Sequence, residues 1–217
     1  GQMLFSKKSK IDHRYKAFEK IKKYIELLKP SFAMVAFDGV APVAKLEQQR
    51  NRRYKSWLEH QIVQNISGRV SEEWCTASIT PGTNFMNSLG QTVTEYFSNF
   101  DQCKVLVSTS NEAGEGEHKI FAHIRDNASK YKKLTHVIYG LDADLIMLGL
   151  ILSCEFKNIY LFKETQHFDY ISNIDKNLDY YFNLNKLGLE IDNIMNNVNI
   201  SQSIYDYILI CFLCGND

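Results

Sequence analysis

Hydrophobic residues recur along the chain at two different spacings. Residues 15–29 place apolar side chains every three to four positions, which is typical of an amphipathic helix, and Pro30 would end it. Residues 32–37, FAMVAF, form a short apolar run that predicts a buried strand. The polar stretch that follows contains few helix breakers and predicts a long helix over residues 39–65.

The rest of the chain alternates between strand and helix patterns. Residues 68–82 are rich in breakers and predict a loop. After it we expect helices at 84–100, 117–130 and 143–152, and strands at 104–108, 135–140 and 158–162. This alternation predicts an α/β fold with a mostly parallel sheet and helices on both of its faces.

The length of 217 residues is compatible with a single domain over residues 1–217. Within it, the stretch 165–202 is rich in Asn and Asp, and we interpret it as an insertion. The closing run 203–217 is apolar enough to be expected in the core.

Charge and cysteine content narrow the class of protein. Lys plus Arg and Asp plus Glu are 25 each, so uniform coating of a polyanion is not expected and the placement of charge matters more than its sum. The five cysteines lack the spacing of a disulfide framework, which predicts an intracellular protein. Cys211 and Cys214 have no second Cys or His pair nearby, so we expect core packing rather than zinc binding. No apolar run reaches the roughly 18 residues of a membrane span, and we expect no membrane partner.

Acidic residues follow the first three predicted strands. Asp38 ends the first strand, Glu115 and Glu117 follow the second, and Asp142 and Asp144 follow the third. Ligand sites in open parallel sheets form beyond the carboxyl ends of the strands, so these side chains are predicted to converge. Asp217 closes the chain and would add a sixth carboxylate.

Carboxylates gathered in this way repel one another unless cations neutralise them. Oxygen ligands without a His or Cys cluster favour Mg²⁺ or Mn²⁺. Two such ions can clamp the attacking and leaving oxygens of a phosphodiester, so hydrolysis of a nucleic acid is the predicted reaction. Taken one at a time, each acid could equally be a helix cap or a solvated loop residue.

The predicted helix after Asp38 carries a basic face. Four of its side chains fall within one quadrant at about 100° per residue. They are Lys45, Gln49, Arg52 and Arg53. Three cations and an amide donor beside a predicted metal ligand suit a single terminal phosphate better than a long stretch of nucleic-acid backbone.

These segments resemble the catalytic region of the Xrn/Rat-type 5′→3′ exoribonucleases. The resemblance lies in DGVAPVAKLEQQRNRR (38–53), SITPGTNFM (78–86), GEGEHKI (114–120) and GLDADLIMLGL (140–150), and FLCGND at the end resembles a further family segment. It implies a PIN-like nuclease that removes mononucleotides from the 5′ end of single-stranded RNA, prefers a 5′-monophosphate and uses two Mg²⁺ or Mn²⁺ ions.

The resemblance also implies roles for single residues. Carried over position by position, it implies that the metal ligands are Asp38, Glu115, Glu117, Asp142, Asp144 and Asp217, and that the 5′-phosphate pocket is formed by Lys45, Gln49, Arg52 and Arg53. The family has an earlier strand with a further metal-binding aspartate, and residues 1–30 do not show it. We therefore expect the sequence to be a fragment of a longer conserved region.

Two other functions remain open from the sequence. A structure-specific 5′ flap nuclease acting on DNA would share the acidic α/β site, and an RNA-binding scaffold would keep the fold without catalysis. No sequence pattern indicates a base preference or a protein partner. For the compartment we favour the cytoplasm over the nucleus.

Overall fold

The α/β fold predicted from the sequence is confirmed. A computed structural model describes residues 10–67, 78–164, 175, 178–195 and 199–215. The chain divides into two compact units, residues 2–120 and residues 121–217, and the division falls inside one helix. The predicted loop at 68–82 lies mostly outside the described residues.

The described part of the first unit contains a parallel pair of strands and three complete helices. Phe32 lies opposite Lys104, and Ala36 lies opposite Ser108. In chain order the elements are α1 (Lys10–Leu28), β1 (Phe32–Ala36), α2 (Val43–Ser67), α3 (Asn84–Ser98), β2 (Lys104–Ser108) and the start of α4 (Gly116–Asp126).

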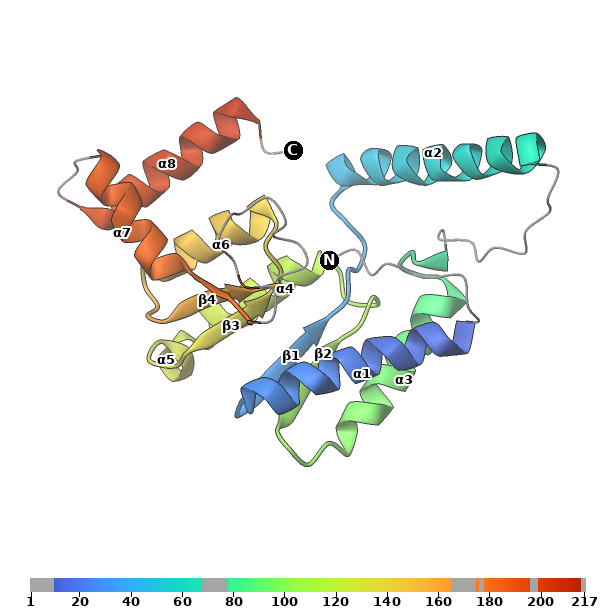
Figure 1. Cartoon of the computed structure of the whole chain (residues 1–217), viewed down its shortest axis with the longest axis horizontal. Coiled ribbons are helices and arrows are strands. Elements are labelled where there is room, and N and C mark those ends of the chain that lie inside the picture. Colours follow the sequence, from blue (N-terminus) through green and yellow to red (C-terminus); the bar gives the residue numbers. More distant parts are fainter. Residues whose placement is uncertain (1–9, 68–77, 165–174, 176–177, 196–198, 216–217) are drawn as a thin grey trace. The chain divides into compact units, whose positions relative to one another are not determined.

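The core of this unit lies between α1, α3 and the sheet (Figure 1). Phe18 of α1 and Val93 and Phe97 of α3 are buried together, and Val35 and Val107 pack against them. Alternate residues of a strand face the same side of a sheet, so one apolar face of β1 and β2 is covered by these two helices. This packing fixes the two strands and, with them, the position of their carboxyl ends.

The second unit contains a mixed sheet. β3 pairs with β4 in parallel, and β4 pairs with β5 in antiparallel orientation. The elements after α4 are α5 (Ala128–Tyr131), β3 (His136–Tyr139), α6 (Ala143–Ser153), β4 (Ile159–Phe162), β5 (Tyr181–Asn183), α7 (Leu184–Met195) and α8 (Ile200–Cys214).

Helices α6 and α7 pack against β4 in this unit. Gly149 of α6 makes room for the side chain of Leu184 at the start of α7, because a Cβ added there would overlap the Leu184 Cδ1 methyl group. Asn185 of α7 accepts a hydrogen bond from the Ile159 amide and donates one to the Phe156 carbonyl, both at 2.9 Å. These bonds satisfy backbone groups at the amino end of β4.

The observed elements differ from the predictions in several places. The strands form two small sheets within the described residues, whereas we expected one. The predicted helix 117–130 is divided at Asn127 into α4 and α5. The described part of 165–202 contains β5 and α7, which the sequence analysis did not predict.

The expectation that the closing run 203–217 is core was wrong for much of α8. Leu209, Phe212 and Leu213 are exposed, and Leu213 is 80% accessible. Cys214 is exposed as well, which corrects the expectation of core packing for this cysteine. Among the described helices, none combines the length and the hydropathy that crossing a bilayer requires.

Candidate functional site

Backbone hydrogen bonds join the segment after β1 to the segment between β2 and α4. The Gly39 amide donates to the Gly114 carbonyl at 2.8 Å, and the Gly114 amide donates to the Val40 carbonyl at 3.1 Å. A Cβ at Gly39 would overlap the carbonyl oxygen of Glu112, so only glycine permits this approach. The segment after β1 is thereby held against the segment that leads into α4.

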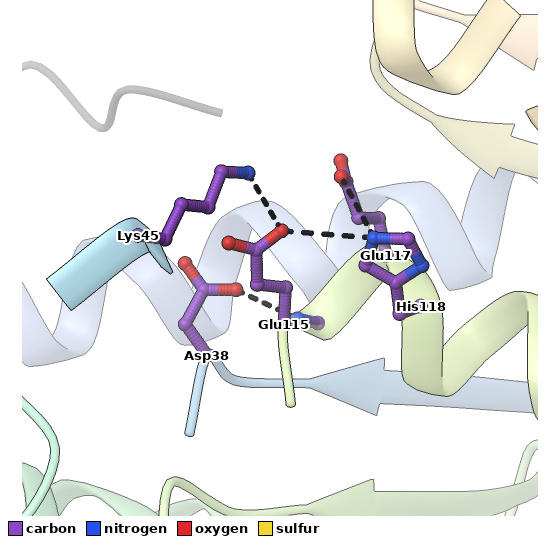
Figure 2. Close-up of polar contacts among 6 residues, drawn as sticks. Asp38, Lys45, Glu115, Glu117 and His118 are labelled. Carbon is purple, nitrogen blue, oxygen red and sulfur yellow. Dashed lines mark hydrogen bonds and ion pairs between the residues drawn. The ribbon is translucent and has the colours of Figure 1, made fainter. Parts of the chain in front are cut away.

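Asp38 caps α4 from a distant part of the chain. The amide of Gly116, the first residue of α4, donates to Asp38 Oδ1 at 2.7 Å (Figure 2). The first amides of a helix have no partner inside the helix, and a carboxylate at this end also interacts favourably with the helix dipole. Asp38 therefore has a structural role here in addition to the predicted metal-binding role.

Glu115, Glu117 and His118 lie together at the start of α4 (Figure 2). One ligand atom from each lies within 4.8 Å of the others. His118 Nε2 is 3.7 Å from Glu115 Oε2 and 4.0 Å from Glu117 Oε1. The two carboxylates fit the oxygen preference of Mg²⁺ or Mn²⁺, while His118 was not among the predicted ligands.

Lys45 connects the basic helix to this acidic group. It lies in the first turn of α2, and its Nζ is 2.9 Å from Glu115 Oε2. The side chain of Glu115 is only 11% exposed, whereas that of Lys45 is 45% exposed. A cation of the predicted phosphate pocket thus contacts a carboxylate of the predicted metal site.

The other three predicted phosphate-binding residues also lie on α2. Arg53 Nη2 donates to Gln49 Oε1 at 3.1 Å, as expected for positions four apart on a helix. Arg52 and Arg53 are exposed. Their binding of phosphate stays a prediction.

Asp142 and Asp144 lie in the second unit. Asp142 occupies the N-cap position of α6, but its side chain makes no capping hydrogen bond. Its Oδ1 is instead 3.5 Å from Nζ of Lys163, which directly follows β4. Asp144 is half-buried in the first turn of α6, and Asp217 lies outside the described residues. The structure brings Asp38, Glu115 and Glu117 together within the first unit; convergence of all six acids stays a prediction.

The sequence analysis did not predict Lys119 or Lys163 as neighbours of the acids. Lys119 Nζ donates to the carbonyls of Phe37 and Thr109, at 2.9 Å and 3.0 Å. Burial lowers the pKa of Lys119, and the charges of Glu112 and Asp38 act in the opposite direction. No sequence pattern marks either lysine, because only the folded chain shows which carbonyls and carboxylates they reach.

Comparison with known proteins identifies the family. A family model described as XRN 5'-3' exonuclease N-terminus matches residues 2–165. The 5'-3' exoribonuclease 1 of Saccharomyces cerevisiae is 33% identical over 234 residues, which cover 92% of this chain and 15% of that protein. The 5'-3' exoribonuclease 2 of Schizosaccharomyces pombe is 37% identical over 161 residues, covering 61% of this chain and 16% of that protein.

A third relative extends the match along the chain. The 5'-3' exoribonuclease 2 of Eremothecium gossypii is 28% identical over 261 residues, covering 92% of this chain and 27% of that protein. The chain spans about a quarter or less of the length of these curated relatives.

Proposed function

The chain belongs to the XRN 5'-3' exonuclease family, and from that membership we propose that it is the catalytic region of a metal-dependent 5′→3′ exoribonuclease. The proposed substrate is single-stranded RNA with a 5′-monophosphate, and the products are mononucleotides. The observation that carries the proposal is the 2.9 Å contact between Lys45 Nζ and Glu115 Oε2. It joins a basic helix suited to a terminal phosphate to an acidic group suited to divalent cations.

In this proposal the basic face of α2 selects the RNA end. Lys45, Gln49, Arg52 and Arg53 bind the 5′-phosphate through charge-assisted hydrogen bonds. A pocket sized for one phosphate excludes a triphosphate or a cap, and a 5′-hydroxyl lacks the charge that these cations bind. Contacts to phosphate carry no information on sequence, so we expect little base preference.

The acidic residues hold the cations. Asp38, Glu115 and Glu117 would supply oxygen ligands in the first unit, and Asp142, Asp144 and Asp217 would supply those of the remainder of the chain. When bound, two Mg²⁺ or Mn²⁺ ions would neutralise charge on the scissile phosphate and lower the pKa of an attacking water. Glu115 also orients the ammonium group of Lys45, which supports the proposal that the phosphate-binding cations lie next to the cation site.

The test is the length of the products from body-labelled RNA. The complete protein is incubated with 5′-monophosphate or 5′-hydroxyl RNA, with Mg²⁺, Mn²⁺ or EDTA. Mononucleotides released from the monophosphate substrate and abolished by EDTA support the proposal. Release of longer flaps from branched DNA would favour the flap nuclease, and RNA binding without any product would favour the scaffold.

A further inference from the structure

The amino group of Lys119 bridges the carboxyl ends of the two strands in the first unit. It donates to the carbonyl of Phe37 at 2.9 Å and to the carbonyl of Thr109 at 3.0 Å. Phe37 directly follows β1, and Thr109 directly follows β2. Each carbonyl lies just beyond the β1–β2 ladder, and Lys119 supplies a donor to both.

Two carboxylates partly offset the cost of burying the Lys119 ammonium group. Burial lowers the pKa of Lys119, while the carboxylates of Glu112 and Asp38 act in the opposite direction. Glu112 is itself held, because Ser108 Oγ donates to Glu112 Oε2 at 2.6 Å. A half-buried ammonium group needs such compensation, and here it comes from two carbonyls and two acids.

Two segments with predicted metal ligands and the end of β2 meet through this one amino group. Phe37 is followed by Asp38, and Lys119 lies on the first turn of α4 beside Glu115 and Glu117. If the bridge is removed, the end of β1 and the start of α4 lose a direct connection. The spacing of Asp38 from the two glutamates would then be less well fixed.

We infer that Lys119 is a positioning residue, which holds the end of β1, the end of β2 and the first turn of α4 in the arrangement that the cation site needs. This inference rests on the proposed function for its link to activity. Lys119 donates to two backbone carbonyls, so it is not assigned a contact with RNA or metal. Residues that orient metal ligands commonly change metal affinity when they are replaced.

The experiment compares Lys119→Met and Lys119→Arg with a matched control. Lys104→Met serves as the control, because Lys104 is exposed at the opposite end of β2. Mn²⁺ affinity is measured by the electron paramagnetic resonance signal of free Mn²⁺, alongside kcat and KM for 5′-monophosphate RNA and urea unfolding. All measurements use the complete protein.

We expect Lys119→Met to weaken Mn²⁺ binding by about 10- to 100-fold, to lower kcat at limiting metal and to leave KM for RNA nearly unchanged. Excess Mn²⁺ should restore part of the rate, and Lys119→Arg should recover much of the affinity because its guanidinium can still bridge two carbonyls. Lys104→Met should match the wild type in each measurement.

Wild-type Mn²⁺ affinity in folded Lys119→Met protein would overturn the inference, as would a raised KM with unchanged kcat, which would indicate RNA contact. If Lys119→Met does not fold, Lys119→Gln takes its place, and failure of both to fold assigns Lys119 a purely structural role. Mn²⁺ binding does not depend on turnover. A wild type that binds Mn²⁺ but releases no nucleotide would therefore defeat the proposed function and leave the role of Lys119 testable.

Discussion

Helices α4 and α6 each follow a parallel strand, and each has a predicted metal ligand beside its first amides, yet the two acids do different things. At α4, Asp38 accepts a 2.7 Å hydrogen bond from the first amide of the helix. At α6, Asp142 occupies the N-cap position with extended backbone angles, φ −82° and ψ 157°, and makes no capping bond through its side chain. Its carboxylate lies 3.5 Å from Lys163 and is 56% exposed.

The difference separates two roles of a carboxylate. In the first unit the fold itself uses the acid, because Asp38 satisfies a helix amide that would otherwise lack an intrahelical partner. In the second unit the side chain of Asp142 satisfies no amide of α6. Removing Asp38 should therefore affect both folding and the proposed activity, whereas removing Asp142 should affect the proposed activity alone.

The largest expected effect is on turnover. Asp38→Ala and Asp142→Ala should each lower mononucleotide release from 5′-monophosphate RNA by about 10²- to 10³-fold. Each variant removes a carboxylate proposed to hold a cation that neutralises charge on the scissile phosphate. The measurement is the initial rate at saturating RNA and Mg²⁺. Asp101→Ala is the control, since Asp101 is exposed in the turn before β2 and should leave the rate unchanged.

A second prediction concerns the backbone junction of the first unit. Gly39→Ala should destabilise the protein by about 3 kcal/mol, because the added Cβ overlaps the carbonyl oxygen of Glu112 and the two segments must separate. Urea unfolding followed by circular dichroism measures the change. Val40→Ala, at an exposed neighbouring position, should stay within about 0.5 kcal/mol of the wild type. Equal stability of the two variants would show that the junction is not tightly closed.

A third prediction tests the contrast between the two helices directly. Asp38→Ala should lower the free energy of unfolding by about 1 kcal/mol, the usual cost of losing a helix cap. Asp142→Ala should change it by less than about 0.5 kcal/mol, since no capping bond is lost. Metal-free urea titrations measure both variants, and Asp38→Asn is a matched variant that keeps an acceptor oxygen. An equal loss in both alanine variants would remove the distinction between the two helices.

Much of the fold was predictable because its strongest local patterns agree with the tertiary structure. Residues 32–36 and 104–108 form β1 and β2, because short apolar runs bounded by polar residues favour strands. The expectation that the first of these strands is buried was wrong, since every residue of β1 is half-buried. The apolar run of α8 misled the prediction. Hydrophobicity alone does not say which side chains of a helix find a partner, and Leu209, Phe212 and Leu213 are exposed.

The grouping of three acids was predictable because the segments after the carboxyl ends of parallel strands meet at one edge of a sheet. Asp38 accepts a hydrogen bond from the first amide of α4, and Glu115 and Glu117 lie at the start of the same helix. Their binding of metal stays a prediction. Lys119 was not predictable in the same way. Its role depends on two backbone carbonyls that are 82 and 10 residues away along the chain. Every residue has a backbone carbonyl, so the sequence does not show which ones accept a hydrogen bond.

The smallest expected effect tests the contact that joins the two predicted sites. A divalent ion bound by Glu115 must compete with the ammonium group of Lys45, which lies 2.9 Å from Glu115 Oε2. Lys45→Met should therefore tighten Mn²⁺ binding in the absence of RNA by about fivefold, which corresponds to about 1 kcal/mol for a partly exposed pair. Lys55→Met is the control, because Lys55 lies on the same helix and is exposed.

The same variant should weaken the preference for a 5′-monophosphate over a 5′-hydroxyl, because Lys45 is one of the cations proposed to bind that phosphate. The two effects have opposite signs, so a general loss of structure cannot produce both. Weaker Mn²⁺ binding in Lys45→Met would mean that the ammonium group supports the carboxylate's position rather than competing with the metal. Tighter Mn²⁺ binding with an unchanged preference for the 5′-monophosphate would mean that Lys45 interacts with Glu115 but not with the 5′-phosphate. Gln49, Arg52 and Arg53 would then be the residues proposed to bind that phosphate.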